Sequence, residues 1–224
     1  MKNNLLKENK AVLPSQLIEW LEIGEKSGFV ENFNRNKFLK DIHNKYLSKW
    51  LMSYLLNNHQ SPRLLFRKIS LIDFDSWLPF FEDPETSKHW VEEKESPTIA
   101  CEKWYARQHD RYQNNLGGMN ALIEKSSGLL VGHAGLLVQT VDNIQELEIG
   151  YSLLPKFWGK GYAIEAAQKC KDHAFENNLA TSLISIISLS NLPSQKVAIK
   201  NGMTIDKQTM YKGNEVYIFR VNKV

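Results

Sequence analysis

The sequence predicts an α+β fold in which one mixed, mostly antiparallel sheet is flanked by helices. Alternating apolar segments around short polar turns predict two hairpins, formed by residues 119–124 with 129–138 and by residues 203–211 with 215–221. Two more strand-like segments, 146–153 and 183–187, are each followed by a helical pattern. Hairpins give antiparallel pairs, whereas a strand that is followed by a helix allows parallel pairing, so the sheet should be mixed.

Residues 1–60 differ from the rest and predict a helical N-terminal arm. A short helix should begin at Ser15 and end at Gly24, and a longer helix should cover residues 36–57. The longer helix has a wide apolar stripe, made of Phe38, Leu39, Ile42, Tyr46, Trp50, Leu51, Tyr54 and Leu55. Such a stripe must be covered by the rest of the chain or by a second copy, so a homodimer through these helices is one expectation.

The boundary of the arm is predicted at Ser61-Pro62, because proline interrupts helices. This boundary divides the chain into the arm, residues 1–60, and a main domain, residues 61–224. The main domain should open with a strand at residues 64–70. A short helix capped by Asp73 should follow it.

Two further helices are placed by their end signals. One should cover residues 97–115 and end at Gly117-Gly118, because glycine is common just after a helix. The other should cover residues 193–201 and end at Gly202, before the last hairpin.

The composition favours a folded protein of a reducing compartment. Of its 224 residues 42% are apolar, which supports a packed core. The net charge is only +3 and no dense Lys/Arg cluster occurs, so no nucleic-acid partner is expected. The chain has no signal-peptide pattern and no long apolar run, so no membrane span is expected. Cys101, Cys170 and the six scattered histidines lack metal-ligand spacing, which predicts reduced thiols, a cytoplasmic location and no metal.

A strand-to-helix turn with two glycines, Gly159 and Gly161, is the most informative stretch. Glycine lets a ligand approach the backbone closely, and the first amides of a helix have no internal partner. Those amides and the helix dipole suit an anion such as a phosphate. The P-loop and dinucleotide patterns do not fit, because Leu154 and Ile164 stand where each would need glycine. A helix that simply begins after flexible glycines is the alternative interpretation.

Four short motifs around this turn carry a family resemblance. They are Glu148-Ile149-Gly150-Tyr151, then Trp158-Gly159-Lys160-Gly161-Tyr162-Ala163 with Glu165-Ala166, then Asn191-Leu192-Pro193-Ser194, and finally Lys200-Asn201-Gly202-Met203. The series resembles the GNAT family of N-acetyltransferases, and within it the RimJ/RimL-like ribosomal-protein N-terminal acetyltransferases. The resemblance covers about residues 62–224. Lys156 departs from the usual Gln or Arg but keeps a positive charge, and Asn201 and Met203 replace the usual Leu and Phe, which affects packing.

The resemblance implies the acyl-CoA N-acyltransferase fold, in which strands 146–153 and 183–187 splay apart and hold acetyl-CoA in the wedge. It also implies transfer of the acetyl group to a primary amine, and a protein N-terminal α-amine is the acceptor suggested by this branch. A polyamine or an amino-bearing antibiotic remains an alternative acceptor. The residues expected to bind acetyl-CoA are Leu153, Lys156, Trp158, Gly159, Lys160, Gly161, Tyr162, Ala163 and Asn191.

Acetyl transfer to an amine requires a group that removes the amine proton. Glu148 is the expected base, because it lies on the strand next to the glycine turn, where partial burial can raise the pKa of a carboxylate. Alternatively, Glu148 only orients the amine or forms an ion pair. Glu146 lies on the same strand face and is the second candidate base.

The leaving thiolate benefits from a proton donor, and Ser194 is the expected acid. By resemblance, Asn191 and Ser194 open the helix that faces the CoA sulfur. Both are also good helix-capping residues, which is the competing explanation. Many relatives use a tyrosine in this place, so Tyr211 and Tyr217 are reserve candidates.

The alternative function is a CoA-binding regulatory or antitoxin-like protein-interaction module without turnover. Residues 17–47 faintly resemble the toxin-gripping tail of ParD-type antitoxins, through Gly24-Glu25-Lys26-Ser27-Gly28-Phe29-Val30-Glu31. An acceptor cleft plugged by residues 1–60 would favour this alternative. An intact Glu148 beside an open cleft would favour the enzyme.

Overall fold

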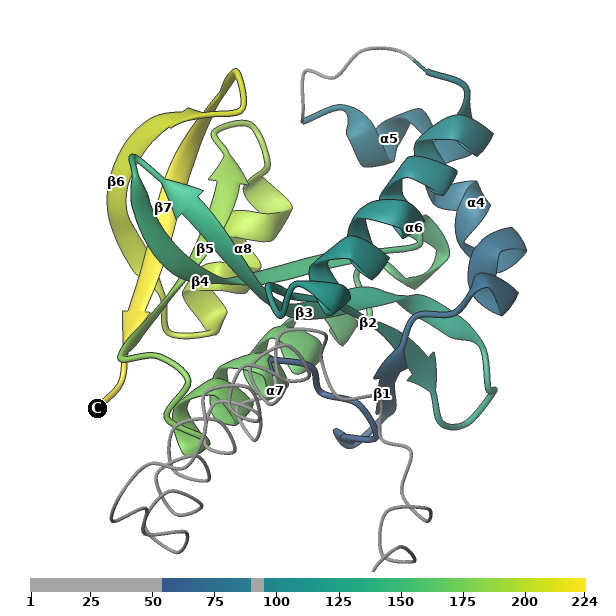
Figure 1. Cartoon of the computed structure of the whole chain (residues 1–224), viewed down its shortest axis with the longest axis horizontal. Helices are drawn as coiled ribbons and strands as arrows, with labels where there is room; N and C mark the ends of the chain where they lie inside the picture. Colours follow the sequence, from purple (N-terminus) through teal and green to yellow (C-terminus); the bar gives the residue numbers. More distant parts are fainter. Residues whose placement is uncertain (1–53, 90–94) are drawn as a thin grey trace, which may run out of the picture. The chain divides into compact units, whose positions relative to one another are not determined.

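A seven-stranded mixed sheet forms the centre of the described part of the chain, residues 54–89 and 95–224 of the computed structural model (Figure 1). The strands are β1 (Leu64–Lys68), β2 (Gly117–Glu124), β3 (Leu130–Val141), β4 (Ile144–Leu153), β5 (Ser182–Ser188), β6 (Thr204–Tyr211) and β7 (Asn214–Asn222). Their order across the sheet is β1-β2-β3-β4-β5-β7-β6. Among these strands β4 and β5 form a parallel pair, and the other pairs are antiparallel. The predicted mixed, mostly antiparallel sheet is therefore confirmed.

Helices cover both faces of the sheet (Figure 1). On one face α7 (Tyr162–Glu176) packs against β3 and β4. On the other face α4 (Phe74–Glu82) contacts β3 and α6 (Pro97–Gln113), and α6 contacts β2. The shorter elements are η2 (Leu71–Asp73), α5 (Pro84–Ser87), η3 (Pro155–Phe157) and α8 (Leu192–Lys200).

His133 of β3 lies in an aromatic cluster on the face covered by α4 and α6. Its ring is fully buried, with centroids 4.2 Å from that of Trp77 and 4.6 Å from that of Trp104. Neither ring nitrogen has a hydrogen-bond partner among the described residues. Burial lowers the pKa of His133 to about 3, so the imidazole is a neutral core side chain.

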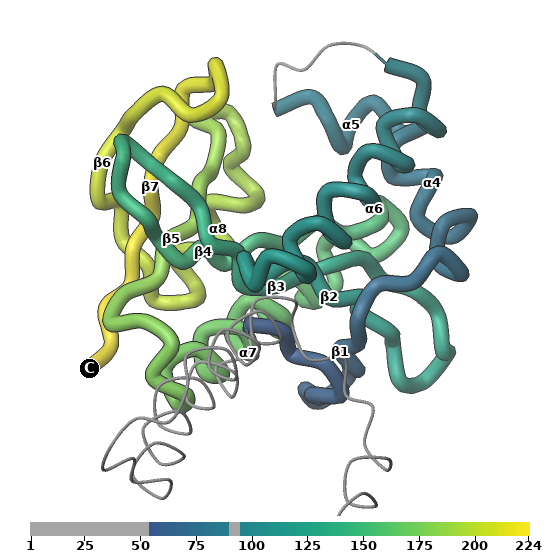
Figure 2. The backbone as a smooth tube through the Cα atoms, viewed as in Figure 1, coloured from purple at the N-terminus to yellow at the C-terminus, as the bar shows by residue number. Residues whose placement is uncertain are grey.

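β6 stands last in the sheet order, yet it returns to the turn between β3 and β4 (Figure 2). The Thr209 hydroxyl donates to an Asp142 carboxylate oxygen at 2.9 Å, and Lys207 Nζ lies 2.7 Å from the other oxygen. This curvature encloses a small second core, made of Val141, Ile184, Ile186, Val216 and Ile218. The sheet therefore curls at its C-terminal end, and residues of β6 come close to β3.

Most of the predicted arm lies outside the described residues, including residues 17–47, the first arm helix and most of the predicted dimer surface. The predicted helix over residues 36–57 is wrong for its last four positions. Residues 54–57 are not helical. Leu56 is buried in the main core, and Asn57 accepts a hydrogen bond from the Lys68 amide at 3.0 Å. This stretch is thus tied to β1 by tertiary contacts that no local pattern records.

Two predicted helix ends are also corrected. Asp73 does occupy the N-cap position of α4, but its side chain makes no cap bond, because the carboxylate binds Arg67 at 2.6 and 2.7 Å and the Ser70 amide at 3.2 Å. Gly117-Gly118 does not end α6 but begins β2, and the left-handed residue after the helix is Asn115, with φ +52°. A Cβ atom at Gly117 would meet the Leu136 carbonyl oxygen at 2.0 Å, so glycine is required there for close strand packing.

A third hairpin, between β3 and β4, was not predicted. It turns at Asp142 and Asn143, with φ +48° and +65°. Such two-residue turns usually carry glycine, but Asn and Asp tolerate the left-handed region. The absence of glycine concealed this turn in the sequence.

No helix within residues 54–89 and 95–224 is long and apolar enough to cross a bilayer. Cys101 and Cys170 are buried free thiols. Over the same residues, His, Cys, Asp and Glu side chains form no group of three that could hold a metal ion.

Candidate active site

The parallel pair of β4 and β5 is confined to one position, where Glu148 lies opposite Ile184. Beyond it, side chains bridge the elements instead of a backbone ladder. The Ser185 hydroxyl donates to the Ile149 carbonyl at 2.9 Å, and the Tyr151 hydroxyl donates to the Ser194 carbonyl at 3.0 Å. Parallel strands in register would share evenly spaced backbone bonds. The strands therefore part toward their C-terminal ends.

Glu148 stands where the two strands part. Its half-buried carboxylate accepts a hydrogen bond from Gln139 Nε2 at 2.7 Å and another from the Ile186 amide. Burial raises the pKa of Glu148 above its ordinary value, although these bonds and the positive charges of Arg111 and Lys212 act in the opposite direction. A carboxylate with a raised pKa accepts a proton from an amine more readily, which suits a general base.

Glu146, the second candidate base, is held in an ion pair. Arg220 of β7 donates to its two carboxylate oxygens at 2.7 and 3.2 Å, and the Glu146 side chain is only 16% exposed. Arg220 also binds Asp206 at 2.9 Å. Because Arg220 binds both oxygens of this carboxylate, Glu146 is less available than Glu148 to contact an acceptor amine.

The glycine turn joins β4 to α7 through η3. Gly159 and Gly161 have φ values of +74° and +82°, a region that L side chains rarely adopt. Gly161 occupies the N-cap position of α7 and has no side chain with which to cap it. The first amides of α7 therefore lack a side-chain cap, and together with the helix dipole they suit an anion.

Two lysines gather at this end of α7. Lys156 Nζ and Lys160 Nζ lie 5.3 and 5.4 Å from the centroid of the same ring, that of Phe157. Phe157 is buried and packs edge-on against Tyr162, with centroids 5.9 Å apart. The fold thus brings two cations and free helix amides together around one fixed ring.

Leu153 and Trp158, both predicted to bind the ligand, are joined by a hydrogen bond. The Trp158 indole donates to the Leu153 carbonyl at 2.7 Å, and the Trp158 residue is 43% exposed. The Leu153 carbonyl is therefore already used within the chain. The indole forms an exposed aromatic surface beside the glycine turn.

An ion pair that sequence reasoning missed anchors the turn. Glu165, in the first turn of α7, accepts hydrogen bonds from the Ser61 hydroxyl at 2.7 Å, the Arg63 amide at 2.7 Å and Arg63 Nε at 2.6 Å. Arg63 also donates to the Lys160 carbonyl at 2.9 Å and lies over the Tyr162 ring at 4.3 Å. No spacing rule connects residues 102 positions apart, so no sequence signal could reveal this contact.

Asn191 and Ser194 meet at the start of α8. Asn191 Oδ1 accepts a hydrogen bond from the Ser194 amide at 3.1 Å, so Asn191 does cap this helix. The Tyr151 hydroxyl donates to the Ser194 carbonyl at 3.0 Å. Burial raises the pKa of the Tyr151 hydroxyl. Tyr151 is therefore a neighbour of the predicted acid that sequence reasoning did not place there.

A comparison with protein families identifies the family of the chain. Residues 63–204, more than half of the chain, match the family model described as acetyltransferase (GNAT) domain. The chain belongs to the GNAT acetyltransferase family. The protein is thus an N-acetyltransferase of the class that uses acetyl-CoA as acetyl donor.

Relatives of this acetyltransferase agree with the match. An uncharacterized N-acetyltransferase, p20 of Bacillus licheniformis, is 29% identical over 174 residues, which cover 72% of this chain and 93% of that protein. The structure of a putative ribosomal-protein-serine acetyltransferase from Vibrio cholerae has a TM-score of 0.61 at 18% identity and covers 74% of this chain and 99% of its own. Mycobacterium smegmatis RimJ, solved with CoA-disulfide, has a TM-score of 0.60 at 15% identity and covers 71% and 81%. At these identities, the two structures show a shared fold.

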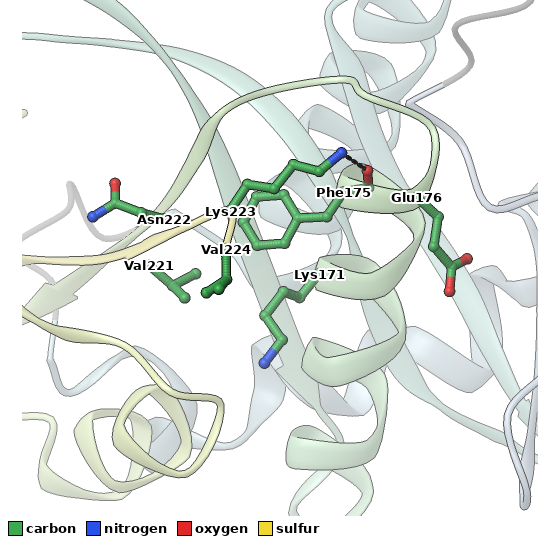
Figure 3. A pocket seen from close by; sticks show the side chains of 7 residues that line it. All are labelled: Lys171, Phe175, Glu176, Val221, Asn222, Lys223 and Val224. Carbon is green, nitrogen blue, oxygen red and sulfur yellow. Dashed lines mark hydrogen bonds between the residues drawn. The ribbon is translucent and has the colours of Figure 1, made fainter.

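A pocket of about 480 Å³ lies elsewhere on the acetyltransferase (Figure 3). It is lined by Lys171, Phe175, Glu176, Val221, Asn222, Lys223 and Val224. These residues belong to the C-terminal end of α7 and the end of the chain, whereas Gly161 is at the other end of α7. Lys223 Nζ donates to the Phe175 carbonyl and to Asn178 Oδ1, each at 2.6 Å, which satisfies the helix end. This pocket is therefore separate from the candidate active site.

Proposed function

We propose that this acetyltransferase moves the acetyl group of acetyl-CoA to the α-amine at the N-terminus of a protein or peptide. The observation that carries the reaction is Glu148, a half-buried carboxylate with a raised pKa at the point where β4 and β5 part. The choice of acceptor is supported by the Vibrio cholerae protein of similar fold, which is named a putative ribosomal-protein-serine acetyltransferase.

The donor site is proposed at the glycine turn. Lys156, Lys160 and the amides of Tyr162 and Ala163 would bind the phosphates of acetyl-CoA, which supplies the activated thioester when bound. No heavy atom lies within 4 Å of a Cβ placed at Gly159, so a ligand can approach the backbone there. The geometry of the turn therefore fits an anionic ligand.

The pantetheine arm is proposed to lie between β4 and α8. Leu153 and Asn191 border this region, but each already uses an oxygen within the chain: the Leu153 carbonyl binds Trp158, and Asn191 Oδ1 caps α8. Any contribution of Leu153 and Asn191 to binding would therefore come from atoms other than these two oxygens. The exposed ring of Trp158 adds an apolar surface at the same end of β4.

Three proton transfers complete the proposed reaction. Glu148 takes a proton from the acceptor ammonium, and the resulting amine attacks the thioester carbonyl. A carbon–nitrogen bond then forms while the carbon–sulfur bond breaks. The thiolate takes the hydroxyl proton of Ser194, the proposed donor, and the second proton of the attacking nitrogen passes to the Ser194 oxygen, which restores the hydroxyl. Backbone amides of the parted strands would stabilise the oxyanion.

Turnover of acetyl-CoA with a panel of peptides, polyamines and amino-bearing antibiotics tests the acceptor. Transfer to peptide N-termini alone is expected, and transfer only to a small amine would reject the acceptor class. Glu148→Gln should lower turnover about a hundredfold or more with acetyl-CoA affinity unchanged. The wild-type rate should fall as the pH drops through the raised pKa of Glu148, because only the carboxylate accepts a proton. A Glu148→Gln enzyme with wild-type rates across the pH range would reject the base.

Two further expectations, a cytoplasmic location and a homodimer through the arm, are also proposals. The buried, unpaired thiols of Cys101 and Cys170 are compatible with a reducing compartment. Light scattering of the full chain tests the dimer, and a monomer mass would reject it.

A further inference from the structure

A hydrogen-bonded chain of three side chains ends at Glu148. The Tyr211 hydroxyl donates to Gln139 Oε1 at 3.0 Å, and Gln139 Nε2 donates to Glu148 Oε2 at 2.7 Å. These residues come from β6, β3 and β4. They meet because β6 returns to the turn between β3 and β4, where Lys207 and Thr209 hold Asp142.

Tyr211 determines which end of the Gln139 amide faces Glu148. A phenol is most useful here as a donor, and only the amide oxygen can accept its proton. The amide nitrogen must then point toward the carboxylate. Without the phenol, the amide could rotate and place its oxygen against the charged Glu148 oxygens. Tyr211 therefore acts on Glu148 through Gln139 and does not need to touch it.

The tyrosine itself is well held in place. Its ring packs against the second core of Val141, Ile184, Ile186, Val216 and Ile218. Burial raises the pKa of Tyr211 to about 12, and the charge of Glu148 acts in the same direction. The phenol is therefore neutral and keeps its proton for Gln139 at any working pH.

We propose that Gln139 and Tyr211 are positioning residues for acetyl transfer, which hold the Glu148 carboxylate ionised and oriented toward the acceptor amine. This inference rests on the proposed role of Glu148 as the base. It assigns a function to Tyr211 different from that of an acid, because the phenol points to Gln139 and not to a leaving group.

Other charged and polar groups also face the Glu148 carboxylate and enter any reading of its pH dependence. Arg111 of α6 and Lys212 after β6 favour the ionised form, and the Ile186 amide of β5 donates to it. Tyr151 of β4 also interacts with its charge. Arg111 also interacts with the Tyr211 phenol, and Lys212 Nζ lies 5.2 Å from the centroid of its ring. Gln139→Leu leaves the phenol and both cations in place, so a shift in that variant reports on the bond from Gln139.

The variant Tyr211→Phe removes the hydroxyl and keeps the ring in the second core. It should lower kcat about tenfold, less than the hundredfold that a misplaced reacting group can cost. Because the ionised Glu148 carboxylate loses stabilisation from Gln139, its pKa should rise, and the acidic limb of the kcat/KM profile should move to higher pH. Calorimetric acetyl-CoA affinity should stay at the wild-type value. Gln139→Leu removes the direct donor and should move the limb further in the same direction.

Thr209→Val is the matched control. Thr209 lies on the same strand and also bonds to the β3–β4 hairpin, but its partner is Asp142 and not Gln139. This variant should keep the wild-type pH profile, although it loses one inter-strand bond. If Thr209→Val shifted the acidic limb as much as Tyr211→Phe, the effect would come from general loosening of β6, and the proposal would be overturned.

The double variant Glu148→Gln/Tyr211→Phe separates this inference from the proposed function. If Tyr211 acts through Glu148, the double variant should be no slower than Glu148→Gln alone. Additive losses would show that Tyr211 acts elsewhere, which overturns the positioning role. If Glu148→Gln is impaired but Tyr211→Phe shows no shift of the acidic limb, the inference is overturned, and Glu148 keeps its role as the base. If Glu148→Gln is not impaired, Glu148 is not the base, and the inference that rests on this role is overturned as well.

Discussion

Gly161→Ala should weaken acetyl-CoA binding beyond its effect on stability. An L residue in the left-handed region costs about 1–2 kcal/mol, and Gly161 has φ +82°. A chain of this size loses roughly 2–4 °C of melting temperature per kcal/mol, so the expected fall is roughly 2–8 °C. The new methyl group also stands at the N-cap of α7, where a phosphate would approach the amides.

Gly213→Ala provides the control for backbone strain. Gly213 has φ +77° and no heavy atom within 4 Å of its Cβ position, and it lies in the β6–β7 turn. At Gly161 the nearest atom to that position is Arg63 Nη2, at 3.4 Å, so neither alanine clashes severely. The two variants should therefore melt at similar temperatures.

Titration calorimetry with acetyl-CoA measures the difference between the two variants. A hydrogen bond to a charged group is worth about 1.5–3 kcal/mol, which corresponds to about 10- to 150-fold in Kd. Gly161→Ala should lose this factor, and Gly213→Ala should bind like the wild type. If both variants bind with the same affinity, the glycine turn is not the phosphate site.

Three further predictions concern other residues. His133 keeps a pKa of about 3 when folded and 6.5 when unfolded, so wild-type stability should fall by about 1.4 kcal/mol per pH unit below 6.5. Urea unfolding at pH 7 and pH 5 should show that His133→Leu does not lose this stability at the lower pH. If the variant and the wild type lose the same stability between these pH values, the burial argument is contradicted. Asn191→Ala should cost about 1 kcal/mol of stability, because α8 loses its cap. Ser194→Ala keeps the capped amide and should lower kcat more than stability. If Ser194→Ala instead lowers stability and leaves kcat unchanged, both residues serve only in capping. Arg63→Gln breaks the pair with Glu165 and should weaken acetyl-CoA binding by calorimetry, whereas unchanged affinity would make the pair purely structural.

The strands and helices could be predicted because alternation and helical spacing record which side of an element is buried. The hairpin of β2 with β3 and that of β6 with β7 follow directly from such patterns. The corrected positions are those where a side-chain or tertiary contact, and not local propensity, decides the structure. Asp73 has a good capping side chain, but Arg67 binds it more strongly than the helix amides could.

The candidate site divides in the same way. The glycine turn and Glu148 are local features, so a single stretch of sequence could point to them. Their surroundings are not local: Arg63 reaches Glu165, and Tyr211 reaches Gln139, only after the sheet has formed and curled. Residue type and spacing carry no record of these pairs, because only the tertiary fold brings the partners together.

The narrow contact between β4 and β5 has a consequence for how the protein opens. One block, from β1 to β4, and a second block, from β5 through β7 to β6, are joined in the sheet by one parallel register position, and side chains such as Leu183 of β5 and Val141 of β3 pack across the boundary. Amide hydrogen exchange should therefore be fast along this seam and slow inside each block, because the seam has few backbone bonds to break. A co-substrate that hydrogen-bonds to both strands would supply the connection that the backbone does not make between them. With it bound, the two blocks should unfold as one cooperative unit.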